Sequence, residues 1–329
     1  MTDANKIHRC QQLDIDDFPP GQVSKAFVHI VADGLGCSIK IPLLVARGRK
    51  IGPVFGLTAA VHGNELNGVR VIHNIFEHIP VERLKGTLVG VVCVNVPGLH
   101  AHERAIYRQF DLNHMFPGAA DGNVAQVYAH RLLTRVISKF DYLVDLHTAS
   151  FGRINSLYVR ADLGNETTRN MALLQRPQII LHNPPADSTL RGAAMELGIP
   201  AITVEIGDPQ RFQPRFIRST RAGLRDLLAD AGMLPRRKRA DAPAPILCGS
   251  SQWLYTDHGG LLEVLPDVAV RVTRGETVAR LRDAFGDIFS SFVAPHDGVV
   301  IGKSNNPVGP TGSRILHLGH EIGSTDVIG

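Results

Sequence analysis

Two separate stretches of the sequence carry histidine and glutamate in a pattern suited to binding a metal ion. In the stretch 56–76, His62 directly follows an apolar run, and Glu65 stands three residues later at the expected start of a helix. A second apolar run, 142–147, ends in His147. Two histidines and one glutamate with an open fourth position are a donor set of hydrolytic zinc sites. The pattern therefore predicts one zinc ion per chain, held by His62, Glu65 and His147.

Two further carboxylates are placed to assist such a metal ion. Asp145 stands two residues before His147, so both side chains face the same side of a strand, and Asp145 is positioned to orient the histidine. Glu205 lies near the carboxyl end of the apolar run 200–207, where a buried charge is costly without a purpose. We predict that Glu205 is the general base that moves a proton from water to a leaving amine. The alternative for Glu205 is an ion pair with an arginine.

Four arginines are candidates for contact with a substrate. The polar stretch 96–118 contains Arg104 and Arg108, and either one could hold a developing oxyanion. Arg153 and Arg191 are candidates for binding a substrate carboxylate. A lone arginine is more often a surface residue, so each of these predictions depends on what else lies near the side chain.

The elements that must position these residues alternate between strands and helices. Buried strands are predicted at four apolar runs, 54–61, 88–96, 142–147 and 200–207. Helices are predicted where the periodicity is helical, at 65–78, 123–140 and 214–232, and a β-hairpin is predicted at 24–46. This alternation indicates an α/β/α sandwich with a mixed or largely parallel sheet. In such sheets ligands bind at the carboxyl ends of the strands, where both predicted histidines stand.

The C-terminal part of the chain has a different composition and a different sequence pattern. The stretch 234–245 is rich in proline and charge and is predicted to be a linker. Its basic cluster, Arg236 to Arg239, is short and is expected to be solvated rather than to bind nucleic acid. Beyond it, short β-runs separated by glycine predict a small all-β domain. The predicted domains are therefore 1–240, a zinc hydrolase catalytic domain, and 241–329, a C-terminal β domain.

Composition excludes several classes of protein. The 329 residues are 44% hydrophobic and 20% charged, with a formal net charge of +4, as in an ordinary globular protein. The four cysteines lie far apart and form no CxxC pair, which argues against a thiolate zinc site or a disulfide framework. No apolar run approaches the ~20 residues of a membrane span, and the first residues lack an apolar signal core. We expect a cytoplasmic protein without membrane or nucleic-acid partners; a homo-oligomer is left open.

Four motifs in this order resemble the succinylglutamate desuccinylase and aspartoacylase family. They are HGNE at 62–65, DLNxxFPG at 111–118, DLHT at 145–148 and TVEIG at 203–207. The resemblance covers nearly the whole chain and implies a zinc-carboxypeptidase-like fold. It also implies that His62, Glu65 and His147 are the zinc ligands. Glu205 is implied as general base and proton shuttle, and Arg104, with Arg108 as the alternative, as the arginine that polarises the scissile carbonyl.

The sequence departs from the family pattern at one position. Asn113 matches the asparagine of the family motif DLNR, but His114 stands where that motif has an arginine that binds a substrate carboxylate. Histidine cannot form the guanidinium fork and is only partly charged at neutral pH. Either Arg153 or Arg191 must then hold the acid, or the substrate is a less acidic amide, so N-acetylaspartate and succinylglutamate do not follow from the resemblance.

The C-terminal part is similar to a biotinyl/lipoyl-type β-sandwich, which makes the predicted domain barrel-sandwich-like. It lacks the Met-Lys hairpin for cofactor attachment, and Lys303 stands in another context, so we expect a scaffold domain without a swinging arm. The expected activity is that of a zinc-dependent amidohydrolase that deacylates a small N-acyl amino acid or related amide. A metallopeptidase acting on short peptides is the first alternative. A non-catalytic binding protein on the same scaffold is the second.

Overall fold

Four parallel strands form the centre of the fold. The computed structural model describes residues 7–186, 188–238 and 242–323. The central strands are β4 (Lys50–Ala59), β5 (Lys85–Val91), β6 (Tyr142–His147) and β10 (Ala201–Ile206). β5 pairs with β4, β4 with β6, and β6 with β10, all in the parallel direction. Their carboxyl ends therefore meet at one edge of the sheet, and the register there places Glu205 opposite His147.

Outer strands on both sides make the sheet mixed. These are β1 (Ile7–Cys10), β2 (Gln22–Ala32) and β3 (Ser38–Arg47) on one side and β8 (Leu157–Ala161) and β9 (Ile179–His182) on the other. β2 and β3 form the predicted antiparallel hairpin, and β3 runs antiparallel to β5. β8 runs antiparallel to β10 and parallel to β9. The expectation of a mixed sheet in an α/β fold is confirmed.

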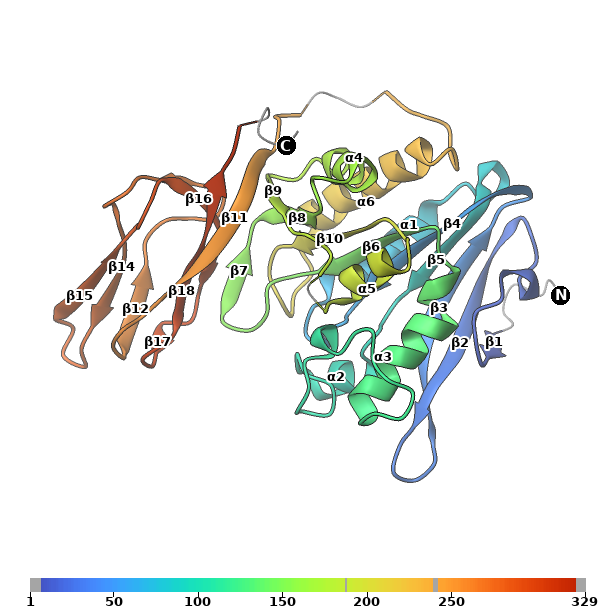
Figure 1. Cartoon of the computed structure of the whole chain (residues 1–329), viewed down its shortest axis with the longest axis horizontal. Helices are drawn as coiled ribbons and strands as arrows, with labels where there is room; N and C mark the ends of the chain where they lie inside the picture. The colour runs from blue at the N-terminus through green and yellow to red at the C-terminus, as the bar shows by residue number, and fades with distance from the viewer. Residues whose placement is uncertain (1–6, 187, 239–241, 324–329) are drawn as a thin grey trace.

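Helices cover both faces of this sheet (Figure 1). One face carries α1 (Asn67–His78), α4 (Glu166–Leu174) and α6 (Pro214–Asp230), and the other carries α3 (Val124–Arg135) and α5 (Leu190–Glu196). Each face has its own buried apolar core, with Ile72 and Leu224 in the first and Tyr128 and Leu132 in the second. Burial of this apolar surface is the main favourable contribution to folding. Short 3₁₀ helices lie at Ile15–Asp17, Val81–Arg83, Leu112–His114 and Ile137–Lys139.

The prediction that Glu65 begins a helix is wrong. β4 ends at Ala59, and α1 begins only at Asn67. His62 and Glu65 therefore both lie in the turn between the two elements, where the Glu65 N–H donates to the His62 carbonyl at 3.1 Å. Ala60 adopts a left-handed φ of 51°, which ends the strand two residues before the predicted end.

Two other predicted elements are shorter than expected. β5 ends at Val91, and the chain then enters α2 (Val96–Ala101), whose first turn is capped by the side chain of Asn95. α3 ends at Arg135, and the 3₁₀ helix Ile137–Lys139 occupies the end of the predicted helix. The third predicted helix, 214–232, begins at the predicted residue, because α6 starts at Pro214.

The segment between β6 and β10 contains elements that the sequence pattern did not predict. They include β7 (Arg153–Asn155), β8, α4, β9 and α5. Each of these strands or helices has nine residues or fewer. The predicted helices α1, α3 and α6 have 12 residues or more, over which a helical period is easier to recognise.

The C-terminal part consists of strands over the described residues from 246 to 323, as predicted. β11 (Ile246–Tyr255), β18 (Arg314–Glu321), β16 (Gly298–Ser304) and β13 (Arg271–Val272) continue the large sheet. β12 (Gly260–Val264), β14 (Thr277–Arg282), β15 (Ile288–Val293) and β17 (Val308–Gly309) form a second sheet. A separate apolar core draws on both sheets, with Leu281 from one and Leu316 from the other.

Hydrogen bonds connect the C-terminal strands to the rest of the molecule. β11 pairs in parallel with β9, and β7 pairs antiparallel with β16. The large sheet therefore runs without interruption in the order β1-β2-β3-β5-β4-β6-β10-β8-β9-β11-β18-β16-β13. The predicted domain boundary between residues 240 and 241, like Arg239 of the basic cluster, lies outside the described residues. Among the helices that the structure describes, none is long and apolar enough to cross a membrane.

Candidate metal centre and active site

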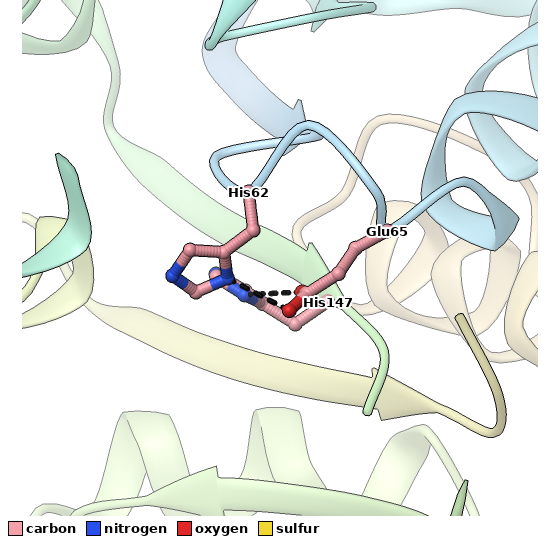
Figure 2. Close-up of side chains that lie close together, drawn as sticks. All are labelled: His62, Glu65 and His147. Carbon is pink, nitrogen blue, oxygen red and sulfur yellow. Dashed lines mark hydrogen bonds and ion pairs between the residues drawn. The ribbon is translucent and has the colours of Figure 1, made fainter. Parts of the chain in front are cut away.

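Three buried side chains converge where the central strands end (Figure 2). Nδ1 of His62 lies 2.8 Å from Oε1 of Glu65, and Nδ1 of His147 lies 3.0 Å from Oε2 of the same carboxylate. One ligand atom of each residue lies within 4.8 Å of the others, and all three residues are buried. The structure thus brings the three predicted ligands together around one point.

The donor atoms fit a divalent metal ion. Among the described residues, Nδ1 of His62 has no hydrogen bond, although it is buried and faces the Glu65 carboxylate. A buried nitrogen without a hydrogen bond is unfavourable unless another partner takes its lone pair. Burial opposes the charge of Glu65, but the two histidines outweigh it and hold the pKa of this carboxyl well below its usual range. Two imidazole nitrogens and an ionised carboxylate are ligands that zinc accepts.

The turn that carries His62 and Glu65 depends on close backbone packing. A Cβ atom on Gly63 would lie 2.0 Å from the carbonyl carbon of Gly98 and 2.2 Å from the nitrogen of Leu99. Both contacts are with the backbone of α2, which cannot move aside as a side chain can. Glycine at position 63 therefore lets the turn rest directly on α2, and this fixes where the two ligands point.

Each of the two histidines contacts a carboxylate through Nε2, the ring nitrogen that faces away from Glu65. Asp145 accepts from Nε2 of His147 at 2.7 Å, and its other oxygen accepts from Thr58 Oγ1 at 2.6 Å. Asp111 lies 3.1 Å from Nε2 of His62. Because Nε2 of each ring contacts a carboxylate, Nδ1 is the nitrogen that faces Glu65 and could bind a metal ion. Asp145 was predicted in this position. Asp111 was noted only as part of the DLN motif.

Arg104 lies beside the cluster, whereas Arg108 does not. Nη1 of Arg104 is 3.2 Å from Oε1 of Glu65 and 3.0 Å from Oγ of Ser150, and its Nε and Nη2 contact Oδ2 of Asp111. Arg108 has a side chain that is 78% exposed, pairs with Glu103 and does not line the cavity. The structure therefore brings Arg104, and not Arg108, to the candidate site.

Glu205 lies next to the cluster with its carboxylate nearly buried. Nδ2 of Asn155 donates to Oε2 of Glu205 at 3.1 Å, and Nε of Arg160 lies 3.8 Å from Oε1. Burial raises the pKa of Glu205, while the nearby charges of His147 and Arg160 lower it and that of Glu65 raises it; the net shift is upward. Glu205 therefore does form an ion pair with an arginine, as the alternative predicted, but the contact is long and the net shift of its pKa is still upward.

The cluster opens into a cavity of about 370 Å³. This volume suits a small ligand. Asn113 and His114 line it, and Oδ1 of Asn113 accepts from the Leu190 N–H at 3.0 Å, which ties the loop to α5. Arg191 lines the cavity too, but its guanidinium donates to the carbonyls of Asn183 and Pro184. Arg153 also lines the cavity. So do residues that the sequence did not suggest: Ser150, Asn155, Tyr158, Arg160, Trp253 and Arg314.

Only some of these additional residues left a signal in the sequence. Tyr158 and Arg160 alternate in the short stretch LYVRA, a strand pattern that could have been read as such. Trp253 is the single tryptophan of the chain, and a tryptophan that follows the polar residues 250–252 in a strand is a candidate for binding. Nothing local indicates that Trp253 or Arg314, from the C-terminal strands, would reach this cavity.

Comparisons with known proteins agree with the fold and the motifs. Residues 52–231 match the model of the succinylglutamate desuccinylase/aspartoacylase catalytic domain. The chain is 24% identical over 281 residues to the N-alpha-acetyl-L-2,4-diaminobutyric acid deacetylase of Halomonas elongata, with 81% of each chain covered.

Two solved structures have the same fold over nearly the whole chain. The product-bound ectoine utilization protein EutE (DoeB) from Ruegeria pomeroyi has a TM-score of 0.82 at 22% identity, covering 91% of this chain and 95% of that one. The succinylglutamate desuccinylase/aspartoacylase from Rhodobacter sphaeroides has a TM-score of 0.83 at 20% identity, covering 94% and 98%. At these identities the likeness concerns the fold, and it includes the C-terminal strands.

Proposed function

The chain belongs to the succinylglutamate desuccinylase/aspartoacylase family, and on this basis we propose that it is a zinc-dependent deacylase. Its substrate is a small N-acyl amino acid or a related amide, and its reaction is hydrolysis of the amide bond. The name of the Halomonas elongata relative, a deacetylase of an N-acetylated diamino acid, supports this class of reaction. Because His114 replaces the arginine of the family motif, we do not assign the substrate of any one relative to this chain.

One observation carries the proposal. Two imidazole nitrogens and a carboxylate converge in a cavity that also contains the nearly buried carboxylate of Glu205. His62, Glu65 and His147 would hold one zinc ion. When bound, zinc supplies a water of lowered pKa and a Lewis acid for the acyl carbonyl oxygen.

Glu205 acts as the general base in this proposal. Its raised pKa brings it closer to the range in which a carboxylate can both take and return a proton near neutral pH. It accepts a proton from the water that attacks the acyl carbon and delivers a proton to the nitrogen as the C–N bond breaks. The products are a carboxylic acid and a free amine. Asn155 holds one carboxylate oxygen of Glu205 in place during these transfers.

Arg104 stabilises the charge that develops on the acyl oxygen. Its guanidinium is already oriented by Asp111 and Ser150, so little reorganisation accompanies the reaction. Asp111 contacts both this arginine and His62 and so couples the position of the oxyanion partner to that of a ligand.

We propose further that residues 241–329 form a barrel-sandwich-like β domain that serves as scaffold. The separate apolar core of the C-terminal strands supports this division. Nζ of Lys303, a lysine of the C-terminal part without the Met-Lys context for cofactor attachment, donates to the carbonyl of Pro266 at 2.8 Å and to Asp267 at 3.1 Å. A lysine engaged in this way supports a structural role and no swinging arm.

A substrate screen with controlled metal content tests the function. Zinc-loaded and chelator-treated protein are each incubated with N-acetyl, N-succinyl and N-formyl amino acids and, in parallel, with dipeptides. We expect amine release from at least one N-acyl amino acid, loss of that activity on chelation, and recovery when zinc is restored. Faster cleavage of dipeptides would instead favour the metallopeptidase. No hydrolysis by protein that binds one zinc per chain would contradict the proposed activity.

A further inference from the structure

Two arginines share one tryptophan on the wall of the cavity. The guanidinium carbon of Arg314 lies 5.0 Å from the ring centroid of Trp253, and that of Arg153 lies 5.8 Å from it. The ring of His317 stacks on the same indole at 4.9 Å with an interplanar angle of 6°. Cation–π contact with an indole holds an arginine side chain in one orientation without using its N–H donors.

These residues come from both parts of the molecule. Arg153 begins β7, which pairs with β16 of the C-terminal part. Trp253 lies in β11 and Arg314 begins β18, and these two strands pair with each other. The C-terminal strands therefore do more than support the catalytic part, because they supply an aromatic ring and a positive charge to its cavity.

Neither Arg153 nor Arg314 is paired with a carboxylate at close range. Over the part of the chain that the structure describes, neither guanidinium has an ion pair or a hydrogen bond, and each makes a cation–π contact with the indole of Trp253. Burial lowers the pKa of Arg153, and the charges of Arg314 and Arg104 lower it further, whereas the more weakly acting charges of Glu65 and Glu205 raise it; the net shift is downward. An anion bound between the two guanidinium groups would relieve this repulsion.

The other arginines of the cavity are already engaged. Arg104 contacts Glu65 and Asp111. Arg191 donates to two backbone carbonyls. Arg160 donates to the Tyr158 hydroxyl at 2.9 Å and has a further hydrogen bond to Asn183. The donors left for a ligand are those of Arg153 and Arg314.

We propose that Arg153 and Arg314, held on Trp253, form a subsite that binds a carboxylate of the substrate. This inference rests on the proposed function and narrows its substrate class to N-acyl amino acids with a carboxylate away from the scissile bond. Two guanidinium groups provide paired N–H donors that match the geometry of a carboxylate. The carboxylate can belong either to the amino acid or to the acyl group, and the experiment separates the two.

The test uses pairs of substrates that differ by one carboxylate. N-acetylglutamate is compared with N-acetylglutamine, which tests the side-chain carboxylate. An N-acetyl amino acid is compared with its α-amide, which tests the α-carboxylate. An N-succinyl amino acid is compared with the N-butyryl amino acid, which tests the carboxylate of the acyl group. We expect the wild type to prefer the carboxylate in at least one pair. In Arg153→Gln and Arg314→Gln this preference falls about 10- to 100-fold, mainly through KM, as for loss of a charge-assisted hydrogen bond. The affected pair identifies the carboxylate that the subsite binds.

Two further variants sharpen the result. Arg314→Lys keeps the charge but not the fork, so its preference should lie between wild type and Arg314→Gln. Arg274→Gln removes an exposed arginine of the same C-terminal part that does not line the cavity, and it should keep the wild-type preference. Unchanged preference for every pair in both Arg→Gln variants overturns the subsite.

A binding measurement separates failure of the subsite from failure of the proposed reaction. Succinate is titrated into zinc-loaded wild type and into both Arg→Gln variants by calorimetry, which needs no turnover. Weaker binding in the variants by about 10-fold or more supports the subsite even if no substrate in the screen is hydrolysed. Equal affinity, or no binding to the wild type, overturns it even if the enzyme proves to be an active deacylase.

Discussion

Glu205 lies among groups that act on its charge in opposite directions. Burial raises its pKa, the charges of His147 and Arg160 lower it, and the charge of Glu65 raises it again. A carboxylate that was simply paired with an arginine would have a lowered pKa and would hold its charge firmly. The upward shift is what a group needs if it is to accept a proton and release it again.

Replacement of this carboxylate should separate catalysis from metal binding. In Glu205→Gln the amide keeps the shape and a hydrogen bond with Asn155 but cannot accept a proton from water. We expect unchanged zinc content and a kcat lower by about 10²- to 10⁴-fold. Metal analysis and steady-state kinetics measure the two effects, and Glu196→Gln, at an exposed position of α5, is the control. Near-normal turnover in Glu205→Gln would refute its role.

Asp111 contacts two residues of the site at once, His62 through Oδ1 and Arg104 through Oδ2. In Asp111→Asn one oxygen is lost and the charge with it. We predict zinc affinity about 10- to 100-fold weaker, because the imidazole is no longer held by a carboxylate. Competition with a chelating dye measures the affinity. The exposed Asp121→Asn is the matched control, and the same affinity in Asp111→Asn as in this control would contradict the prediction.

The residues at strand ends were the ones that the sequence could predict. Strand ends gather at one edge of an α/β sheet, so His147 and Glu205 could be expected near each other from their places in two apolar runs. Asp111 could not be given its role in the same way, because a loop has no period that fixes where its side chains point. Arg104 and Arg108 show the same limit, since only the path of the loop decides which of them faces the cluster.

At the scale of elements, the three-residue strand β7 connects Glu205 to the C-terminal strands. Asn155 ends β7, donates to Glu205 and lies opposite Gly302 of β16. A Cβ on Gly302 would lie 2.3 Å from Oδ1 of Asn155 and 3.0 Å from the carbonyl oxygen of Ile154. Glycine at position 302 therefore leaves the room that the Asn155 side chain needs in order to reach Glu205.

We predict that Gly302→Ala lowers activity without loss of zinc. The methyl group forces Asn155 to shift, so Glu205 loses its hydrogen bond, and overpacking of this kind costs about 1–3 kcal/mol of folding free energy. Turnover should fall while metal content stays at the wild-type level. Gly259→Ala, where the nearest atom lies 3.4 Å from the added Cβ, is the control. Wild-type kcat in Gly302→Ala would show that β16 does not position Asn155.

Elements with a clear apolar run or helical period were predicted, and elements without one were missed. β6 was predicted at its observed bounds because a mainly apolar run that ends in His147 stands between the polar residues Asp141 and Thr148. The start of α1 was placed two residues early, because the sequence does not show that the turn around His62 closes through its own hydrogen bond. β7 holds three residues, too few for any period to be recognised, and the alternation in the five residues of β8 was not used.

At the scale of the whole molecule, the cavity is completed by strands far away in the sequence. Trp253 and Arg314 come from the C-terminal strands, and the pairing of residues 153–155 with 302–304 spans most of the second half of the chain. Local patterns carry no information on such long-range pairing. The sequence therefore predicted the presence of the C-terminal β part, but not that it lines the cavity.

His317 lies where the two parts meet, and it makes the stability of the whole chain sensitive to acid. The ring is buried against Trp253, and Nε2 lies 2.7 Å from Ser251 Oγ. Burial, together with the charges of Arg160, Arg314 and Arg153, lowers its pKa to about 3. Between this value and an unfolded pKa of about 6.5, the unfolded chain binds a proton that the folded chain does not. The free energy of unfolding therefore decreases as the pH falls through this window.

The contribution of His317 can be separated from that of other titrating groups by comparing how the free energy of unfolding depends on pH in wild type and in a variant. His317→Gln cannot be protonated but can still hydrogen-bond Ser251. We predict that its free energy of unfolding depends less on pH between 6 and 4 than that of wild type, by about 1.4 kcal/mol per pH unit. Urea unfolding in the presence of a chelator measures both slopes, so that release of metal does not contribute. His320→Gln removes an exposed imidazole of the same strand and is the matched control. The same pH dependence of the free energy of unfolding in wild type and His317→Gln would show that protonation of His317 does not destabilise the folded state.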